Sequence, residues 1–236
     1  MRLDIFLTKN HDVQSRNKAC ELIKTSKVKV NGEIITKPSF NVEQTHTIEL
    51  LEEQLYVSRA AYKLKYFLEE IPLDIKGKKA LDIGSSTGGF TQILLEKEVE
   101  SVTCVDVGSN QLHESIKYHA KISFHEQCDI RNFKAQTPFE LVTCDVSFIS
   151  LHHILDAINE LSSHEIIILF KPQFEVGNHI KRDKKGVVKD AKAIEKARST
   201  FIEATRKLNW TLQYHSLSQL EGKEGNQEEL LYFIKQ

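Results

Sequence analysis

The stretch Leu81-Asp82-Ile83-Gly84-Ser85-Ser86-Thr87-Gly88-Gly89-Phe90-Thr91 decides the fold class of this chain of 236 residues. It begins as a short apolar strand, passes through a glycine-rich turn and opens a helix expected over 88–97. Glycines at such a junction expose helix N-terminal N–H groups and let a ligand approach the backbone closely. The stretch therefore predicts the first, ligand-binding β–α unit of a parallel sheet.

Apolar runs of strand length alternate with helical patterns along the rest of the chain. After a helix that is expected to be capped by Ser58 and to end before Pro72, strands are expected over 80–83, 102–107, 122–125, 141–145, 166–170, 212–217 and 230–234. Helical patterns over 88–97, 110–118, 150–162 and 190–208 separate the first six, except the third and fourth. The last two are joined too briefly for a parallel crossover, which predicts an antiparallel hairpin. The fold class is therefore α/β, a seven-stranded Rossmann-like sheet with six parallel strands, as in class I adenosylmethionine-dependent methyltransferases.

Composition and charge narrow the class of protein. Hydrophobic residues make up 40% and charged residues 28% of the chain, as in folded globular proteins. The longest apolar run, residues 166–170, is far shorter than the roughly 20 residues of a membrane span. The N-terminus has no signal-peptide pattern, and the four cysteines form no Cys-x-x-Cys pair. We therefore expect a reduced, cytoplasmic protein with no metal site and no membrane span.

Acidic residues at the ends of the first three strands complete an expected cofactor site. Asp82 precedes the glycine loop, where an acid would repel a pyrophosphate and suits the amino group of S-adenosyl-L-methionine. Asp106 is placed to accept ribose hydroxyls and Asp129 to receive an adenine amino group. NAD is the alternative, which the spacing Gly84-x-x-x-Gly88-Gly89 disfavours. The expected cofactor residues are Asp82, Gly84, Ser85, Gly88, Gly89, Phe90, Asp106, Val107 and Asp129.

Residues 1–50 differ from the rest of the chain in charge. Between Lys9 and Lys37 there are seven basic and three acidic residues, whereas the whole chain has a net charge of −1. Ser15 is expected to cap a helix that runs to Lys24. Two β-branched runs around Asn31-Gly32 predict a hairpin. Together these elements make a compact cationic face suited to nucleic acid, the alternative being a solvated face that binds nothing.

This segment resembles the alpha-L RNA-binding domain first seen in a small-subunit ribosomal protein. The matching positions are Arg2-Leu3-Asp4, Ser15-Arg16-x-x-Ala19, Ile23, Val28-x-Val30-Asn31-Gly32 and Lys37-Pro38-Ser39. The resemblance implies binding to structured ribosomal RNA. We expect this domain over 1–50, a linker over 51–57 and a methyltransferase domain over 58–236. The RNA-contact candidates in the first domain are Arg2, Lys9, Arg16, Lys18, Lys24, Lys27, Lys29 and Lys37.

The residues after the fourth strand, Asp145-Val146-Ser147-Phe148, bear on which atom is methylated. Amino-directed methylases usually carry Asn/Asp-Pro-Pro-Tyr/Phe here, and this chain has no proline. Carbon-5 pyrimidine methylases need a nucleophilic cysteine, but Cys144 alternates with Asp145 in a strand pattern and is expected to point away from the site. Both reactions are therefore disfavoured.

Lys63, Asp145, Lys171 and Glu228 resemble the tetrad of ribose 2′-O-methyltransferases of the FtsJ class. A sugar hydroxyl is a poor nucleophile, so a base must lie within hydrogen-bond reach. A free lysine is protonated at neutral pH, so the surroundings of a lysine base must favour the neutral amine. The hypothesis is that Lys171 is the base, that Lys63 and Asp145 shape its charge, and that Glu228 orients a lysine or the ribose. A structural ion pair, or a lysine that only grips phosphate, is the alternative.

The whole chain resembles the TlyA, or haemolysin A, family of bacterial rRNA cytidine-2′-O-methyltransferases. The resembling stretches are 58–64, 81–91, 106–108, 145–150, 171–177, 185–188 and 218–228, and the choice of Glu228 over its neighbours rests on the alignment of Gly225-Asn226. The resemblance implies S-adenosyl-L-methionine as cofactor and rRNA, within ribosomal subunits or ribosomes, as partner. Short members are linked to the large-subunit cytidine alone, which favours 23S over 16S rRNA. A monomer is favoured.

Further candidates surround the tetrad. Arg59 and the basic loop residues Lys181, Arg182, Lys184 and Lys185 are expected to contact RNA, the alternative being a solvated loop. Phe148 and Phe174 follow strand ends and are placed either to stack on a flipped base or to pack in the core. A non-catalytic rRNA-binding assembly factor is the alternative function. A pore-forming haemolysin has little support without a secretion signal or a spanning segment.

Overall fold

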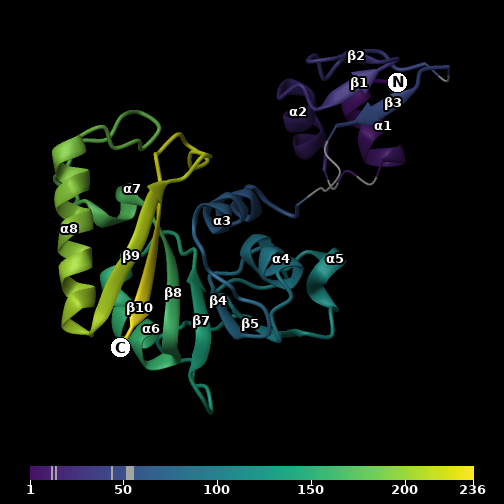
Figure 1. Ribbon diagram of the computed structural model, residues 1–236. Helices are drawn as coiled ribbons and strands as arrows, with labels where there is room; N and C mark the ends of the chain where they lie inside the picture. Colours follow the sequence, from purple (N-terminus) through teal and green to yellow (C-terminus); the bar gives the residue numbers. More distant parts are fainter. Residues whose placement is uncertain (12, 14, 44, 52–55) are drawn as a thin grey trace. The chain divides into compact units, whose positions relative to one another are not determined.

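The computed structural model describes the chain except residues 12, 14, 44 and 52–55 (Figure 1). The chain divides into two compact units, residues 1–55 and 56–236. The linker expected over 51–57 falls largely on residues outside the described ranges. Its last two residues, Tyr56 and Val57, are buried against side chains of unit 2. Among the described residues, no helix is both long and apolar enough to cross a membrane.

The described residues of unit 1 form two helices and a small antiparallel sheet. The helices are α1 (Leu3–Asn10) and α2 (Arg16–Lys24), and the strands β1 (Val28–Val30), β2 (Glu33–Ile34) and β3 (Ile48–Leu50) lie in the order β2-β1-β3. The predicted helix cap and hairpin are confirmed, since the Ser15 hydroxyl accepts a hydrogen bond from the Lys18 amide and β1 pairs with β2. The helix α1 and the strand β3 were not predicted from the sequence, because both are too short for a clear periodic pattern. They are stabilised by packing in the hydrophobic core of unit 1.

Unit 2 is built on one seven-stranded sheet. Its strands are β4 (Lys79–Ile83), β5 (Ser101–Val105), β6 (Ile122–His125), β7 (Phe139–Cys144), β8 (Ser162–Phe170), β9 (Trp210–Leu217) and β10 (Glu229–Lys235), in the order β6-β5-β4-β7-β8-β10-β9. β10 runs antiparallel to both β8 and β9, whereas the other pairs are parallel. The predicted α/β class and antiparallel last strand are confirmed.

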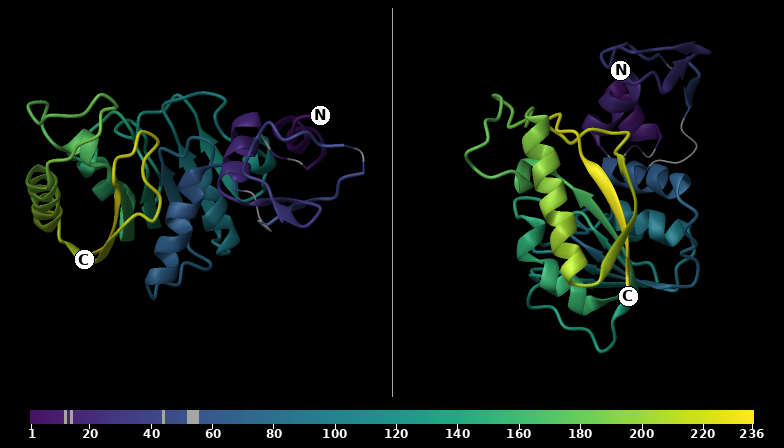
Figure 2. Two further views of the ribbon diagram at one scale, coloured as in Figure 1. Left: turned by 90° about the horizontal axis from the view of Figure 1, so that it is seen from above. Right: turned by 60° about the vertical axis from the view of Figure 1, so that its left-hand side comes forward.

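Helices cover both faces of this sheet (Figure 2). They are α3 (Arg59–Glu70), α4 (Gly89–Glu96), α5 (Glu114–Lys117), the 3₁₀ turn η1 (Leu151–His153), α6 (Leu155–Leu161), α7 (Pro172–Glu175) and α8 (Ala191–Lys207). Alternate residues of each strand enter different cores: Ala80 packs with α3 and α4, whereas Leu81 packs with α6 and α8.

This topology brings residues that are distant in the sequence to one edge of the sheet. The parallel strands β4, β7 and β8 end at that edge, where ligands bind in open α/β sheets. Because β10 is antiparallel, its first residue, Glu229, pairs with Phe170 at the end of β8. Glu228 precedes Glu229 and Lys171 follows Phe170, so both lie at this edge of the sheet.

Candidate active site

Three adjoining cavities lie at this edge of unit 2. The first, of about 340 Å³, and the second, of about 180 Å³, share Gly84, Ser86, Asp145 and Ser147. The third, of about 820 Å³, shares Ser58, Ala60, Ser147 and Lys171 with the second. Ser147 lines all three, so the cavities meet at the ends of β7 and β8.

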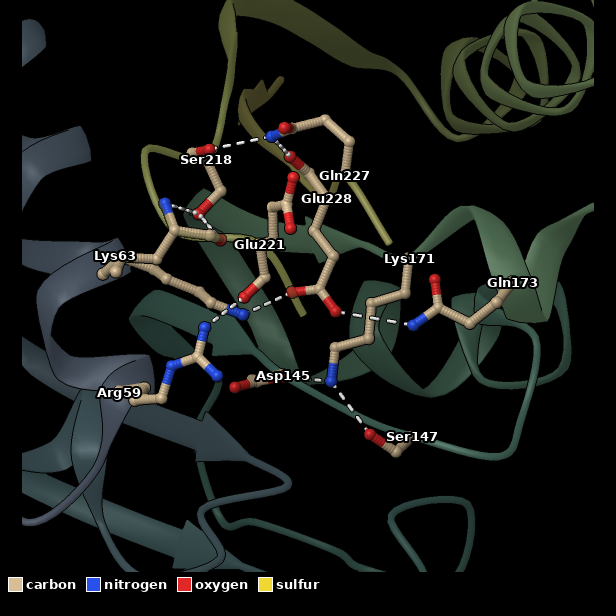
Figure 3. A network of polar contacts seen from close by, with 11 residues as sticks. Arg59, Lys63, Asp145, Ser147, Lys171, Gln173, Ser218, Glu221, Gln227 and Glu228 are labelled. Atoms are coloured by element: carbon tan, nitrogen blue, oxygen red, sulfur yellow. Dashed lines mark hydrogen bonds and ion pairs between the residues drawn. The ribbon is translucent and has the colours of Figure 1, made fainter. Parts of the chain in front are cut away.

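The four predicted tetrad residues come together as two ion pairs (Figure 3). The Lys63 ammonium is paired with Oε2 of Glu228, and both residues are buried, at 8% and 3% exposure. The Lys171 ammonium lies 2.5 Å from Oδ1 of Asp145 and donates a hydrogen bond of 2.9 Å to the Ser147 hydroxyl. Two lysines and two carboxylates thus balance in charge within a largely buried site.

The structure distinguishes Glu228 from the acidic residues near it. The neighbouring Glu229 is also buried but forms an ion pair with Arg198 on α8, at 2.6 Å. Glu221 and Glu224 line the third cavity, and the backbone carbonyl of Glu221 accepts a hydrogen bond of 2.7 Å from Arg59. Among these four acids, Glu228 is the one paired with a tetrad lysine.

The glycines of the loop after β4 are required by packing. Gly84 has a positive φ of 74°, and a Cβ there would lie 2.7 Å from the backbone oxygen of Asp145. A Cβ on Gly89 would lie 2.1 Å from the hydroxyl of Ser58, at the start of α3. We expected these glycines to admit a ligand, but what lies within contact distance of each is another part of unit 2.

Asp82, which precedes the glycine loop, links β4 to α4 and β7. Its side chain is fully buried, and its two oxygens accept hydrogen bonds from the hydroxyls of Thr91 (2.6 Å) and Thr143 (2.9 Å). Burial raises the pKa of this carboxyl to about 6, although the two threonine hydrogen bonds oppose the shift. Asp82 lines neither the first nor the second cavity, contrary to the direct ligand contact that we expected.

The other expected cofactor residues divide between two cavities. Gly84, Ser85, Gly89 and Phe90 line the second cavity, whereas Gly84, Asp106, Val107 and Asp129 line the first, and Gly88 lines neither. The carboxylate of Asp106 accepts hydrogen bonds from the amides of Ser86 and Gly108, at 2.8 and 2.7 Å. Both bonds hold the loops that flank the first cavity.

Two further side chains define the walls of the first cavity. Val107 is 73% exposed, an apolar surface at the end of β5. Asp129 accepts hydrogen bonds from the Arg131 guanidinium, and these lower the pKa of its carboxyl. Asp129 therefore stays ionised with one cation already at its side.

Ser58 was missed as a site residue by the sequence analysis. It precedes α3, but its hydroxyl makes no capping bond and has no hydrogen-bond partner among the described residues, although it is buried and lines two cavities. A buried hydroxyl without a partner is unfavourable by about 1–3 kcal/mol. The unpaired hydroxyl oxygen of Ser58 therefore indicates that the second cavity binds a polar ligand.

The eight basic candidates of unit 1 all reach the surface. Five of them are exposed and Lys18, Lys27 and Lys29 are half-buried. Arg2 and Arg16 both donate to the buried carboxylate of Asp4, at 3.0 and 2.8 Å. These hydrogen bonds hold the pKa of Asp4 well below its usual value, so its side chain is an ionised carboxylate. This buried carboxylate orients both arginines.

The basic loop after α7 is an ordered structure. The Arg182 guanidinium donates to the backbone carbonyls of Gln173, Val176 and Ile180 and so holds the loop, and it also lines the third cavity. We had expected this side chain to contact RNA. Lys181, Lys184 and Lys185 are exposed, and Lys185 lines the third cavity.

Phe148 is 92% exposed and has a positive φ of 65°, which is strained for a non-glycine residue. It lines the first and third cavities, and its ring centroid lies 5.3 Å from that of Phe174. Core packing is therefore not its role. Cys144 is fully buried in β7, as predicted, and burial raises the pKa of its thiol, which does not suit a nucleophile.

Comparison with known proteins agrees with this architecture. The model of FtsJ-like methyltransferases matches residues 56–235, and that of the S4 domain matches residues 1–48. The chain is thus an FtsJ-like methyltransferase domain preceded by an S4 domain. It is 51% identical to the 23S rRNA (cytidine-2′-O)-methyltransferase TlyA of Campylobacter jejuni, with both chains covered in full. It is 35% identical to the 16S/23S rRNA (cytidine-2′-O)-methyltransferase TlyA of Mycobacterium tuberculosis, over 100% and 90% of the two chains. This chain belongs to the TlyA family, as the sequence analysis predicted.

Solved structures agree as well. A protein assigned as a hemolysin from Streptococcus thermophilus is 30% identical, with a TM-score of 0.75 over 100% of this chain and 88% of that one. A methyltransferase of Listeria monocytogenes that depends on S-adenosylmethionine is 14% identical, with a TM-score of 0.58 over 75% of this chain and all of that one. The second likeness concerns the fold alone.

Proposed function

We propose that this protein transfers a methyl group from S-adenosyl-L-methionine to the 2′-hydroxyl of a cytidine in ribosomal RNA. The 23S rRNA of the large subunit is the favoured substrate, because the full-length relative at 51% identity is named for 23S rRNA. The 35% identical relative is named for both 16S and 23S rRNA, so the small subunit is the second candidate. Such an enzyme acts where ribosomes are, in the cytoplasm.

The residues around the first two cavities fit this cofactor. The acceptor oxygens of Asp106 and Asp129 would hold the ribose and the adenine amino group, and the exposed Val107 would contact the adenine. The unpaired hydroxyl of Ser58 and the backbone of the glycine loop would hold the methionine part in the second cavity. The cofactor supplies an electrophilic methyl group.

The observation that carries the proposal is the position of Lys171. Its ammonium is held by Asp145 and Ser147 where the second cavity meets the third, between the expected places of cofactor and nucleotide. The neutral amine at Nζ accepts the proton of the 2′-hydroxyl as that oxygen attacks. General base catalysis of this kind contributes roughly 10²- to 10⁴-fold in rate.

The other three tetrad residues set the orientation and the electrostatic surroundings of Lys171. The Lys63 ammonium disfavours a second positive charge nearby, whereas Asp145 fixes the direction of Lys171 and favours its charge. Glu228 compensates the charge of Lys63 and so keeps it buried. The basic residues of unit 1 and the exposed lysines Lys181, Lys184 and Lys185 bind phosphates of the substrate RNA.

The decisive experiment is transfer of labelled methyl from S-adenosyl-L-methionine to separated ribosomal subunits that lack the modification. We expect label in one subunit at a single site that resists alkaline cleavage, and a loss of at least about a hundredfold in Lys171→Ala. Lys207→Ala, an exposed lysine on α8, is the matched control. The single-turnover rate should rise with pH, and a flat profile from pH 6 to 9 would count against a lysine base.

The alternative is a non-catalytic factor that binds rRNA during ribosome assembly. Cofactor binding by the wild-type protein separates the two functions, because an assembly factor has no need of it. Absence of binding would favour the assembly factor. Binding without transfer to either subunit would point to another RNA or to an assembly intermediate as the substrate.

A further inference from the structure

Gln173 lies on α7, two residues after Lys171, and lines the third cavity beside the tetrad (Figure 3). Its side-chain nitrogen donates a hydrogen bond of 3.4 Å to Oε1 of Glu228. Its side-chain oxygen is buried and has no partner among the described residues. Its backbone carbonyl accepts a hydrogen bond of 3.0 Å from Arg182, which holds the main chain in place. One N–H of the side chain is thus held by Glu228, and the side-chain oxygen is a free acceptor.

The tetrad prevents this amide from turning over. Both carboxylate oxygens of Glu228 are engaged, Oε2 with Lys63 and Oε1 with the Gln173 nitrogen. Turning the amide by 180° would place its oxygen against a carboxylate oxygen and would break the hydrogen bond. Glutamine normally offers a donor or an acceptor as needed. Here, the bond to Glu228 fixes the orientation of the amide, so the side-chain oxygen of Gln173 is left as an acceptor for a ligand.

A buried acceptor without a partner is unfavourable, so the bound substrate is expected to bring a donor. Within an RNA chain, a cytidine has two donor groups, the 2′-hydroxyl and the N4 amino group. The proposed reaction gives the 2′-hydroxyl proton to Lys171, which leaves the amino group. The paired rings of Phe148 and Phe174 line the same cavity and offer a stacking surface for the base next to the amide.

We propose that the side-chain oxygen of Gln173 accepts a hydrogen bond from the N4 amino group of the target cytosine and thereby selects cytidine over uridine. Uridine carries an oxygen at this position, so two acceptors would face each other. Sites built on a hydrogen bond reject the analogue that lacks its partner, because a buried group is then left unpaired. This inference rests on the proposed function and names the group that sets its base specificity.

The test compares two substrates and three proteins. The methylated position is first mapped with the wild-type enzyme on ribosomal subunits that lack the modification. Subunits with cytidine or uridine at that position are then assayed for kcat/KM with wild type, Gln173→Met and Gln213→Met. Methionine matches glutamine in length without its polar atoms. Gln213 lies exposed on β9 and controls for the substitution itself.

We expect wild type and Gln213→Met to favour cytidine by about tenfold or more, and Gln173→Met to bring the ratio close to one. Loss of the bond to Glu228 lowers the rate on both substrates alike, so the ratio isolates the acceptor. An unchanged ratio in Gln173→Met, or a wild type that methylates both substrates equally, would overturn the inference while leaving methyl transfer intact. No transfer by wild type to either substrate would overturn the proposed function, and this inference with it.

Discussion

Lys63 and Glu228, 165 residues apart in the chain, form a buried ion pair in the wall of the third cavity. Lys63 belongs to the helix that precedes the sheet, and Glu228 precedes its last strand. The pair therefore ties the start of unit 2 to its end at the candidate active site. Because both side chains are shielded from water, removal of one leaves the other as an uncompensated charge.

Breaking this pair should destabilise unit 2. We expect Glu228→Leu to lower the free energy of unfolding by about 3–5 kcal/mol, and Lys63→Met/Glu228→Leu to recover most of that loss, because the double variant buries no charge. Urea unfolding followed by the fluorescence of Trp210, the sole tryptophan, reports on unit 2 alone. Glu203→Leu, on the exposed side of α8, is the control.

The same variants separate stability from catalysis. Both Glu228→Leu and Lys63→Met/Glu228→Leu should abolish methyl transfer, although the double variant is expected to be stable. Recovery of transfer together with stability in the double variant would mean that the pair serves the fold only.

Asp82 should make the stability of unit 2 depend on pH. Burial raises the pKa of this carboxyl from 3.8 to about 6, so the folded state binds the proton more tightly than the unfolded state. Its contribution to stability is therefore greatest below about pH 4, falls as the pH rises toward 6, and is lost above that. Relative to Asp82→Asn, the wild type should lose about 3 kcal/mol between pH 4 and 7.

This difference can be measured by urea unfolding of both proteins at several pH values. Comparison with the variant cancels the titration of other groups, such as Asp129, whose lowered pKa acts in the opposite direction. A difference between the two proteins that stays constant with pH would show that Asp82 does not titrate in this range.

Phe148 is expected to lower the stability of the fold and to raise the catalytic activity. Because its backbone is in the left-handed region and its ring is almost wholly exposed, Phe148→Gly should raise the free energy of unfolding by about 1 kcal/mol. It should also lower kcat/KM by about tenfold or more through loss of base stacking. Phe148→Tyr, which keeps the ring, should retain both properties of the wild type. Equal turnover in the glycine variant would exclude stacking on this ring.

In the basic loop, Lys184 and Lys185 are expected to bind RNA, whereas Arg182 is expected to hold the loop in its fold. Lys184→Ala/Lys185→Ala should weaken RNA binding and reduce the slope of log affinity against log salt by about 1–2, since each lysine displaces a counterion. Arg182→Ala should leave the slope unchanged but speed proteolysis within 177–189, because three carbonyls lose their donor. A reduced slope in Arg182→Ala would identify this arginine as a direct phosphate contact.

The sequence by itself determined the fold class and most of the strands and helices, and it predicted the four residues that the structure brings together as two ion pairs. Strand and helix periodicity is local, and the turn at Asn31-Gly32 and the loop after β4 are each built from consecutive residues. The order of the motifs along the chain was sufficient to recognise the family. Short elements such as α1, β3 and α7 were not predicted, because tertiary contacts stabilise them more than their own sequence pattern does.

Only the tertiary structure decided what each charged side chain contacts. Lys63 pairs with Glu228, and Arg182 donates to backbone carbonyls. Asp82 is buried and bonded to Thr91 and Thr143, and the amide of Gln173 is bonded to Glu228. The physical reason is that a polar group's role depends on its burial and its nearest partner. For Lys63 and Gln173, those partners come from segments that are distant in the sequence and meet at the edge of one sheet.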